Sequence, residues 1–227
     1  MKFRSALLTA QSGSIGGITG SHNRGGMYLR ARAQPINPNT PAQQLARSRL
    51  ALNVASWSGL TEAQRIAWND YALANPISDA LGEPRNVGGL GWFIRANSVR
   101  RQASLSQVSA APVLTGPVVL SAPAVTIALA STDVVTYTFT NSDPWAGEVG
   151  GALVVFVSRP QAPTITSFGG PFRFAGFTAG AVSPPTSPGT FTSPFPFAVG
   201  QRIFARFVAV RADGRISADA ITFQVST

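Results

Sequence analysis

Residues of the types that commonly perform chemistry are scarce in this sequence. His22, the only histidine, lies in a glycine-rich stretch with no carboxylate near it in the sequence, whereas a catalytic triad or a metal site needs a second positioned group. Glu62 and Asp70 share one predicted helix, and Glu62 lies in its first turn, where a carboxylate stabilises the helix dipole. The chain has no cysteine, which excludes disulfides and thiolate ligands. We therefore expect no catalytic residues, no metal, no cofactor and no enzymatic activity.

The glycine-rich segment "SGSIGGITGS" (12–21) contains backbone and hydroxyl groups of the kind that bind phosphate. It matches neither the GxxxxGK[ST] loop nor a GxGxxG motif that follows a strand and opens a helix. We interpret it as part of a flexible arm and do not expect nucleotide binding.

The composition is that of a folded protein whose surface carries few charges. Hydrophobic residues make up 44% of the 227 positions, enough for a core, while charged residues make up only 12%. Surfaces poor in charge tend to contact other molecules. The apolar run at residues 6–8 is too short for a secretion signal, and no stretch approaches the roughly 20 apolar residues of a membrane span. We expect synthesis in the cytoplasm and no membrane partner.

The positive charge is concentrated in the first half of the chain. Residues 1–105 contain 12 basic and 4 acidic residues, against 6 basic and 5 acidic residues from position 106 onward. Such a field attracts an anionic partner, either nucleic acid or an acidic protein surface. The candidate partner contacts in this half are Arg24, Tyr28, Arg30, Arg32, Arg47 and Arg49.

Residues 1–38 are predicted to form an extended basic arm. They are rich in glycine and show period-two alternation only at 27–33, which is enough for one or two short strands. Such a segment cannot bury enough surface to order itself. We expect a partner to order it, with 27–33 adding as a strand to a neighbouring sheet.

Residues 39–104 are predicted to form a helical anchor domain of three helices. Thr40 and Thr61 each begin a Thr-x-x-Gln capping box, the signature of a helix start. A third helix is predicted over "LGWFIRANSVRRQ" (90–102). In the first helix Ala46, Leu50, Val54 and Trp57 recur at helical spacing. The expected core of the helical hairpin is Trp57, Leu60 and Trp68.

A linker is expected at 105–115 and an antiparallel β-sandwich at 116–227, so the predicted fold class is α+β. Apolar residues alternate with period two from about Pro112, and Pro, Gly and Asp clusters separate seven candidate strands. These are 118–120, 125–130, 134–140, 152–158, 172–178, 203–211 and 216–225. The proline-interrupted segment 184–197 is expected to be a loop that covers a sheet edge.

Two segments carry resemblances to known families. The segment "GQRIFARFVAVRADGRIS" (200–217) resembles the last hairpin of fibronectin type III domains, which implies a fibronectin-like or immunoglobulin-like sandwich for the C-terminal half. The segment "GGMYLRARAQPINPNTPAQQLARSRLALNVASWSGLTEAQRIAWNDYA" (25–72) resembles the N-terminal halves of uncharacterised proteins of tailed bacteriophages and prophages. This second resemblance implies a structural or accessory role in the virion and carries over no catalytic residues.

These observations together favour a bacteriophage virion protein. We expect a multi-copy component of the capsid or tail, of the decoration or attachment type, which is anchored by its N-terminal half, displays the sandwich and is a homo-oligomer or part of a symmetric assembly. One alternative is a basic nucleic-acid-binding accessory protein that uses Arg24, Arg30, Arg32, Arg47 and Arg49. The segments "QQLARSRLALNVASWSGLTEAQRIAWNDYA" (43–72) and "GWFIRANSVR" (91–100) also resemble high-mobility-group boxes, which implies DNA binding. Another alternative is a carbohydrate-binding module for host attachment, in which aromatic residues between 168 and 197 contact the glycan.

Overall fold

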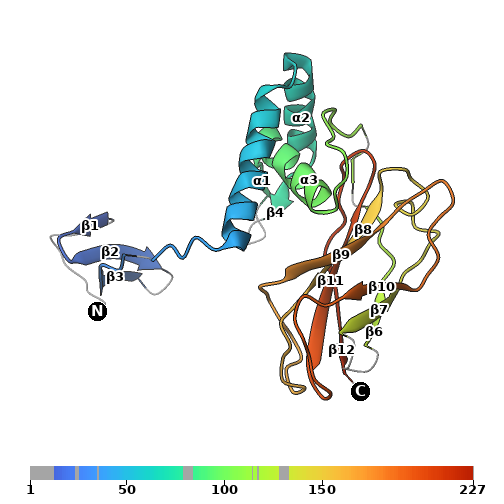
Figure 1. Ribbon diagram of the computed structural model, residues 1–227. Helices are drawn as coiled ribbons and strands as arrows, with labels where there is room; N and C mark the ends of the chain where they lie inside the picture. The colour runs from blue at the N-terminus through green and yellow to red at the C-terminus, as the bar shows by residue number, and fades with distance from the viewer. Residues whose placement is uncertain are drawn as a thin grey trace. The chain divides into compact units, whose positions relative to one another are not determined.

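The chain forms two compact units, Met1–Gln44 and Leu45–Thr227, and each is described by itself. The computed structural model (Figure 1) describes residues 13–23, 26–34, 36–78, 84–113, 115–116, 118–127 and 133–226. Within these ranges it contains three α-helices and several antiparallel sheets, so the fold is α+β.

The first unit contains a three-stranded antiparallel sheet in the order β1-β2-β3. Its strands are β1 (Gly13–Ile15), β2 (Ile18–Asn23) and β3 (Gly26–Ala31). We predicted only one or two strands here. The third forms because Gly16 adopts a φ of 58° and, with Gly17, closes a two-residue hairpin between Ile15 and Ile18.

The sheet of the first unit is amphipathic. The strand registers place Ile15, Ile18 and Met27 on one face and Tyr28 and Arg30 on the other. Ile15 is 77% exposed and Ile18 is 52% exposed. The sheet therefore presents apolar side chains that the described residues of the unit do not cover.

Two of the three helices begin where the capping residues predict, and the third begins without a side-chain cap. The helices are α1 (Pro41–Ser58), α2 (Glu62–Ala74) and α3 (Gly88–Gln102). Both capping boxes form: the Thr40 and Thr61 backbone N–H groups donate to the Gln43 and Gln64 side chains at 3.1 and 3.0 Å, and each threonine hydroxyl accepts from the glutamine N–H. The prediction of helices at these positions is confirmed.

The helices share a core centred on two fully buried rings, Trp68 of α2 and Phe93 of α3, which meet edge to face at 5.6 Å. Leu60 is buried beside them and Trp57 packs against them, as predicted. α2 and α3 approach closely at Gly89, where an added Cβ would lie 2.8 Å from the backbone carbon of Trp68. Only glycine fits at this crossing.

The remaining strands form two larger antiparallel sheets and one short hairpin, β4 (Ile77–Ser78) with β5 (Pro84–Arg85). The three-stranded sheet has the order β10-β7-β6, and its strands are β6 (Ala124–Ile127), β7 (Val134–Thr138) and β10 (Gly189–Thr192). The four-stranded sheet has the order β12-β11-β8-β9, and its strands are β8 (Ala152–Val157), β9 (Arg173–Ala179), β11 (Arg202–Val210) and β12 (Ala220–Val225).

The two larger sheets contribute to one apolar cluster. Tyr137 of β7, Leu153 of β8 and Phe207 of β11 belong to it, together with the fully buried Trp145. Every residue of β8 is buried, because its other side chains contact a second cluster that includes Ala103 and Val99 from the end of α3. The continuous apolar run of β8 is what burial on both faces requires.

Two predictions about the C-terminal half differ from the structure. The segment 184–197, expected to be a loop, contains β10, which pairs with β7. A strand is possible because five proline-free residues lie between Pro188 and Pro194. The predicted strand at 118–120 is reduced to a single bridge between Val118 and Ser217.

The segment 105–115, predicted to be a linker, is held against the helices. Asn97 of α3 exchanges two hydrogen bonds with Val108, at 3.1 and 2.9 Å. The indole N–H of Trp68 donates to the carbonyl of Ser109 at 2.9 Å. The helices and the two larger sheets accordingly belong to one compact unit.

Candidate interaction surface

The predicted partner contacts fall into two separate groups. Tyr28 and Arg30 lie on the same face of β3, and the exposed Arg32 follows that strand. Arg47 and Arg49 lie on α1, about 200° apart around the helix. Arg24 is outside the described residues. The first group belongs to the first unit and the second group to the second unit.

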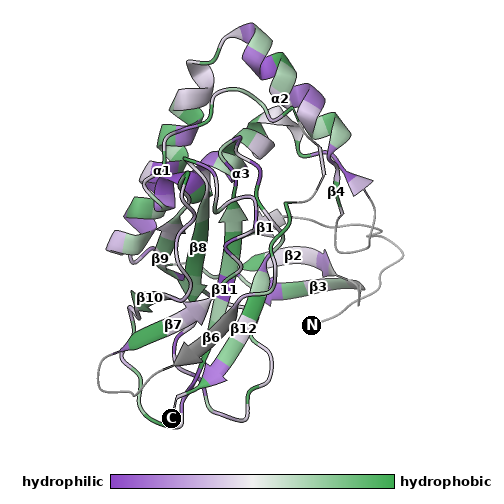
Figure 2. Ribbon diagram, turned by 90° about the vertical axis from the view of Figure 1, so that its right-hand side faces the viewer, coloured by the Kyte–Doolittle hydropathy of each residue, from purple (hydrophilic) through white to green (hydrophobic). Residues whose placement is uncertain are grey.

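A sequence argument based on arginine missed the most unusual surface feature, which is the number of exposed apolar side chains on α1. Among its residues only Asn53 is buried, while Leu45, Leu50, Leu52 and Val54 are 42 to 54% exposed. The sequence predicted an apolar stripe of Ala46, Leu50, Val54 and Trp57, and of these only Trp57 packs against the core of the helices. Figure 2 shows the consequence, since polar and apolar residues alternate along α1 without a single apolar stripe.

Polar groups and one aromatic contact attach α1 to the rest of the second unit. The Asn53 amide donates to the Ser98 hydroxyl at 3.0 Å, and Arg101 donates both to Asn53 and to Ser56. The rings of Trp57 and Phe93 lie 5.5 Å apart. These contacts fix the position of α1 while they leave its leucine and valine side chains at the surface.

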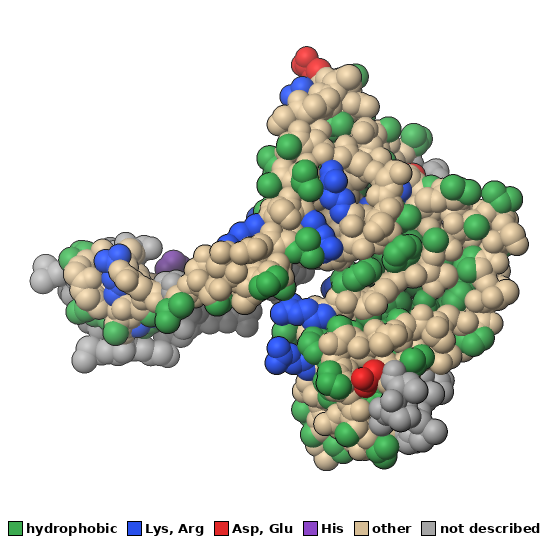
Figure 3. All heavy atoms as spheres, in the orientation of Figure 1, with side chains coloured by type: hydrophobic (Ala, Val, Ile, Leu, Met, Phe, Trp, Pro, Cys, Tyr) green, Lys and Arg blue, Asp and Glu red, His purple; other side chains and the backbone are tan. Residues whose placement is uncertain are grey.

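Exposed apolar side chains on the helices extend beyond α1. On α2, Ile66 is 52% and Leu73 is 68% exposed, and the two are seven residues apart and so lie on one face. Figure 3 shows hydrophobic side chains along α1 and over the β-strands, with few acidic groups between them. These exposed apolar side chains make the helices the candidate interaction surface.

A buried arginine joins α3 to the β-strand region. Arg100 is 3% exposed, and its guanidinium donates to the carbonyls of Ser106 at 2.8 Å, Gly150 at 3.0 Å and Arg211 at 2.8 Å. Burial lowers the pKa of Arg100, which Asp213 partly offsets. The three acceptors come from three different loops, so this side chain connects them.

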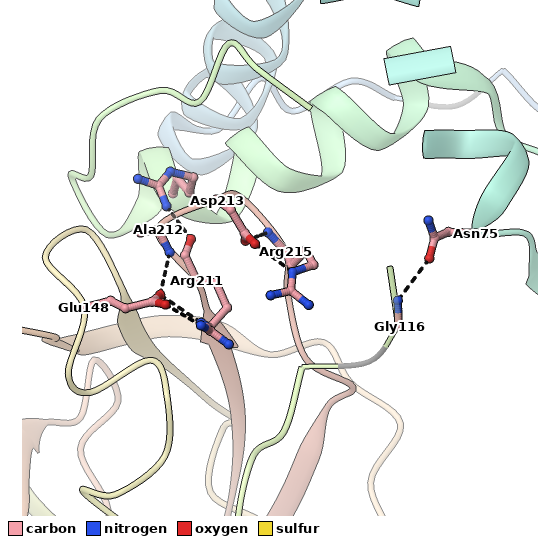
Figure 4. A network of polar contacts seen from close by, with 8 residues as sticks. Asn75, Gly116, Glu148, Arg211, Ala212, Asp213 and Arg215 are labelled. Atoms are coloured by element: carbon pink, nitrogen blue, oxygen red, sulfur yellow. Dashed lines mark hydrogen bonds and ion pairs between the residues drawn. The ribbon is translucent and has the colours of Figure 1, made fainter. Parts of the chain in front are cut away.

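An ion pair orders the loops around Arg100 (Figure 4). Glu148 accepts two hydrogen bonds from the guanidinium of Arg211 and a third, at 3.1 Å, from the N–H of Ala212. The hydrogen bonds from Arg211 hold the pKa of Glu148 below its ordinary value, against the effect of its partial burial. The Asp213 carboxylate accepts from Arg215 at 2.7 Å in the adjoining turn. Through Arg100, these hydrogen-bonded loops are connected to α3.

The phenylalanine residues of the C-terminal half serve two different purposes. Phe191 and Phe197 belong to the cluster shared by the two larger sheets. On the outer face of the four-stranded sheet, Arg202 lies over Phe223 at 4.6 Å and Arg206 lies over Phe156 at 4.4 Å. Guanidinium groups stacked on rings in this way stabilise a sheet face.

The described residues show no constellation for catalysis. They contain no group of three or more potential metal-ligating side chains and no helix long and apolar enough to cross a membrane. His22 is exposed on β2, opposite Met27. No protein-family model matches the chain, and no curated protein matches it.

Proposed function

We propose that the chain is a structural protein of a bacteriophage particle, present in many copies on the capsid or tail and anchored by its N-terminal half. The observation that carries the proposal is the set of exposed apolar side chains on α1: Leu45 and Leu52 lie on one side of this helix, Leu50 and Val54 lie on the opposite side, and all four are at the surface. A helix on the surface of a monomeric protein usually turns most of its large apolar side chains towards the core, whereas α1 leaves these four at the surface. The resemblance of residues 25–72 to proteins of tailed bacteriophages is the reason for proposing that the assembly is a phage particle.

The fold assignment within this proposal is a fibronectin-like or immunoglobulin-like sandwich. It is supported by three-stranded and four-stranded antiparallel sheets that contribute to one apolar cluster. In this arrangement the sandwich is the displayed part and the helices with the arm are the anchoring part. A density map of the particle, into which the sandwich and helices are fitted, tests this division.

Incorporation into particles tests the proposal. Mass spectrometry of purified particles should detect the wild-type chain, and Leu50→Glu should reduce its copy number because a charge enters the anchoring surface. Val182→Glu is a matched control, since Val182 is 84% exposed and lies outside the helices, in the C-terminal half. Absence of the wild-type chain from particles would refute the proposal.

A nucleic-acid-binding role is the second candidate, and the exposed Arg30 and Arg32 favour it. Phosphate contacts would make the affinity for duplex DNA fall steeply as salt rises. Gel-shift titrations at two salt concentrations with wild type and an Arg30→Gln/Arg32→Gln variant test this role. Absence of binding at low salt excludes it.

Carbohydrate recognition is the third candidate. Phe177 and Phe223 are 40% and 44% exposed on the four-stranded sheet, and Arg202 lies over the ring of Phe223. Exposed rings of this kind can stack on sugars. Failure of the full chain to bind any glycan of an array displaying host surface sugars would exclude this role.

A further inference from the structure

One side of α1 carries a self-complementary stripe. Among residues 45–58, six exposed residues fall within an arc of about 140° at 100° per residue, and the centre of this arc is about 130° from Asn53 and about 90° from Trp57. We call them the outward stripe: Arg47, Leu50, Ala51, Val54, Ala55 and Ser58. Leu50 and Val54 are its large apolar members, and they are 49% and 42% exposed.

The spacing of the outward stripe is symmetric under reversal of the helix direction. An antiparallel copy placed with its dyad between positions 52 and 53 pairs Leu50 with Ala55, Ala51 with Val54, and Arg47 with Ser58 of the second helix. Each large apolar side chain then faces a small one, which is how facing helices interdigitate at close distance. No member of the stripe is left without a counterpart within the stripe.

Charge selects the same orientation. α1 contains Arg47 and Arg49 but no acidic residue, and its last turn has no basic residue to interact with the C-terminal end of the helix dipole. An antiparallel copy brings Arg47 to that turn and provides the missing cation. A parallel copy would instead place the two Arg47 side chains together, where like charges repel.

We propose that the partner of the outward stripe is a second copy of this chain, bound by antiparallel packing of α1 on α1. The inference specifies the partner of the α1 surface on which the proposed function rests. Six side chains per helix bury less than the roughly 1,200 Å² of the smallest standard interfaces. The dimer is therefore weak in solution, and neighbouring copies on an assembled particle stabilise it through high effective concentration.

Sedimentation of the full-length chain tests the proposal. Between about 1 μM and 1 mM the mass should rise from 23.7 kDa towards twice that value. Val54→Glu should weaken the dimer about tenfold or more, because it places a carboxylate in the contact. Leu45→Glu, on the opposite side of α1 and equally accessible at 51% exposure, should leave the association unchanged. Circular dichroism verifies that both variants fold.

Cysteine cross-linking tests the register, and the natural chain contains no cysteine to interfere. A mixture of Ala51→Cys and Val54→Cys chains should form disulfide-linked dimers faster than either chain alone, whereas Leu45→Cys mixed with Val54→Cys should not. A monomer at all concentrations, or a dimer that survives Val54→Glu, overturns the proposal. A chain that stays monomeric but still enters particles refutes only the self-pairing, because a different virion protein then covers α1.

Discussion

Replacement of Arg100 by methionine should destabilise the fold, because it removes the hydrogen bonds that connect α3 to the loops of the β-strand region. Methionine keeps most of the packing volume and removes all hydrogen-bond donors. The Arg211 carbonyl retains a hydrogen bond from the Gly214 N–H at 3.0 Å, so the loss falls on the carbonyls of Ser106 and Gly150. With about 1–2 kcal/mol for each buried acceptor that loses its partner, we expect a loss of about 2–4 kcal/mol in the free energy of unfolding.

Urea denaturation followed by tryptophan fluorescence measures this loss, because Trp68 lies among the helices and Trp145 among the strands. Arg100→Lys should recover only part of the stability, since one ammonium group cannot reach acceptors in three loops. Arg173→Met, at an exposed position of β9, is the control and should stay within about 0.5 kcal/mol of wild type. An Arg100→Met variant as stable as this control would refute the reasoning.

Three further predictions follow from the structure. The pKa of Glu148 is lowered in the folded chain. Its ion pair therefore stabilises the fold at pH values above the ordinary carboxyl pKa, and this stabilisation is lost as the pH falls through the lowered pKa. In acid titrations of stability, the Glu148→Gln variant should lack this part of the pH dependence. Gly89→Ala should destabilise the helices by about 2 kcal/mol or more in thermal melts, because its Cβ would overlap the α2 backbone, whereas Gly147→Ala, with open space around the added methyl group, should cost little. Limited trypsin digestion of the isolated chain should cleave first after Arg30 or Arg32 while residues from about 112 onward resist; resistance of the arm equal to that of the strands would contradict this.

The sequence predicted those parts of the fold that depend on neighbours in the chain. Thr40 and Thr61 marked two helix starts because a capping box is formed within four residues. The runs that became β8 and β11 were found because continuous or alternating apolar residues at strand length allow few other structures.

Features that depend on distant partners could not be predicted in this way. The donors of Arg100 reach carbonyls 50 and 111 residues away, so nothing in the local sequence marks this residue as a buried connector. Nothing in the local sequence marks Asn53 either, although its contacts with Ser98 and Arg101 position α1 and leave the leucines of α1 exposed. Helical spacing indicated an apolar stripe on α1 but did not determine which side of the helix would contact the core.

Amide hydrogen exchange of α1 tests the central claim most directly. In the dilute isolated chain, the amides of residues 45–58 should exchange faster than those of α3, because α1 is attached mainly through Asn53, Ser56 and Trp57. In purified particles the same amides should become strongly protected, since a partner covers the helix. Equal exchange of α1 in the free chain and in the particle would contradict the assignment of this helix as the anchoring surface.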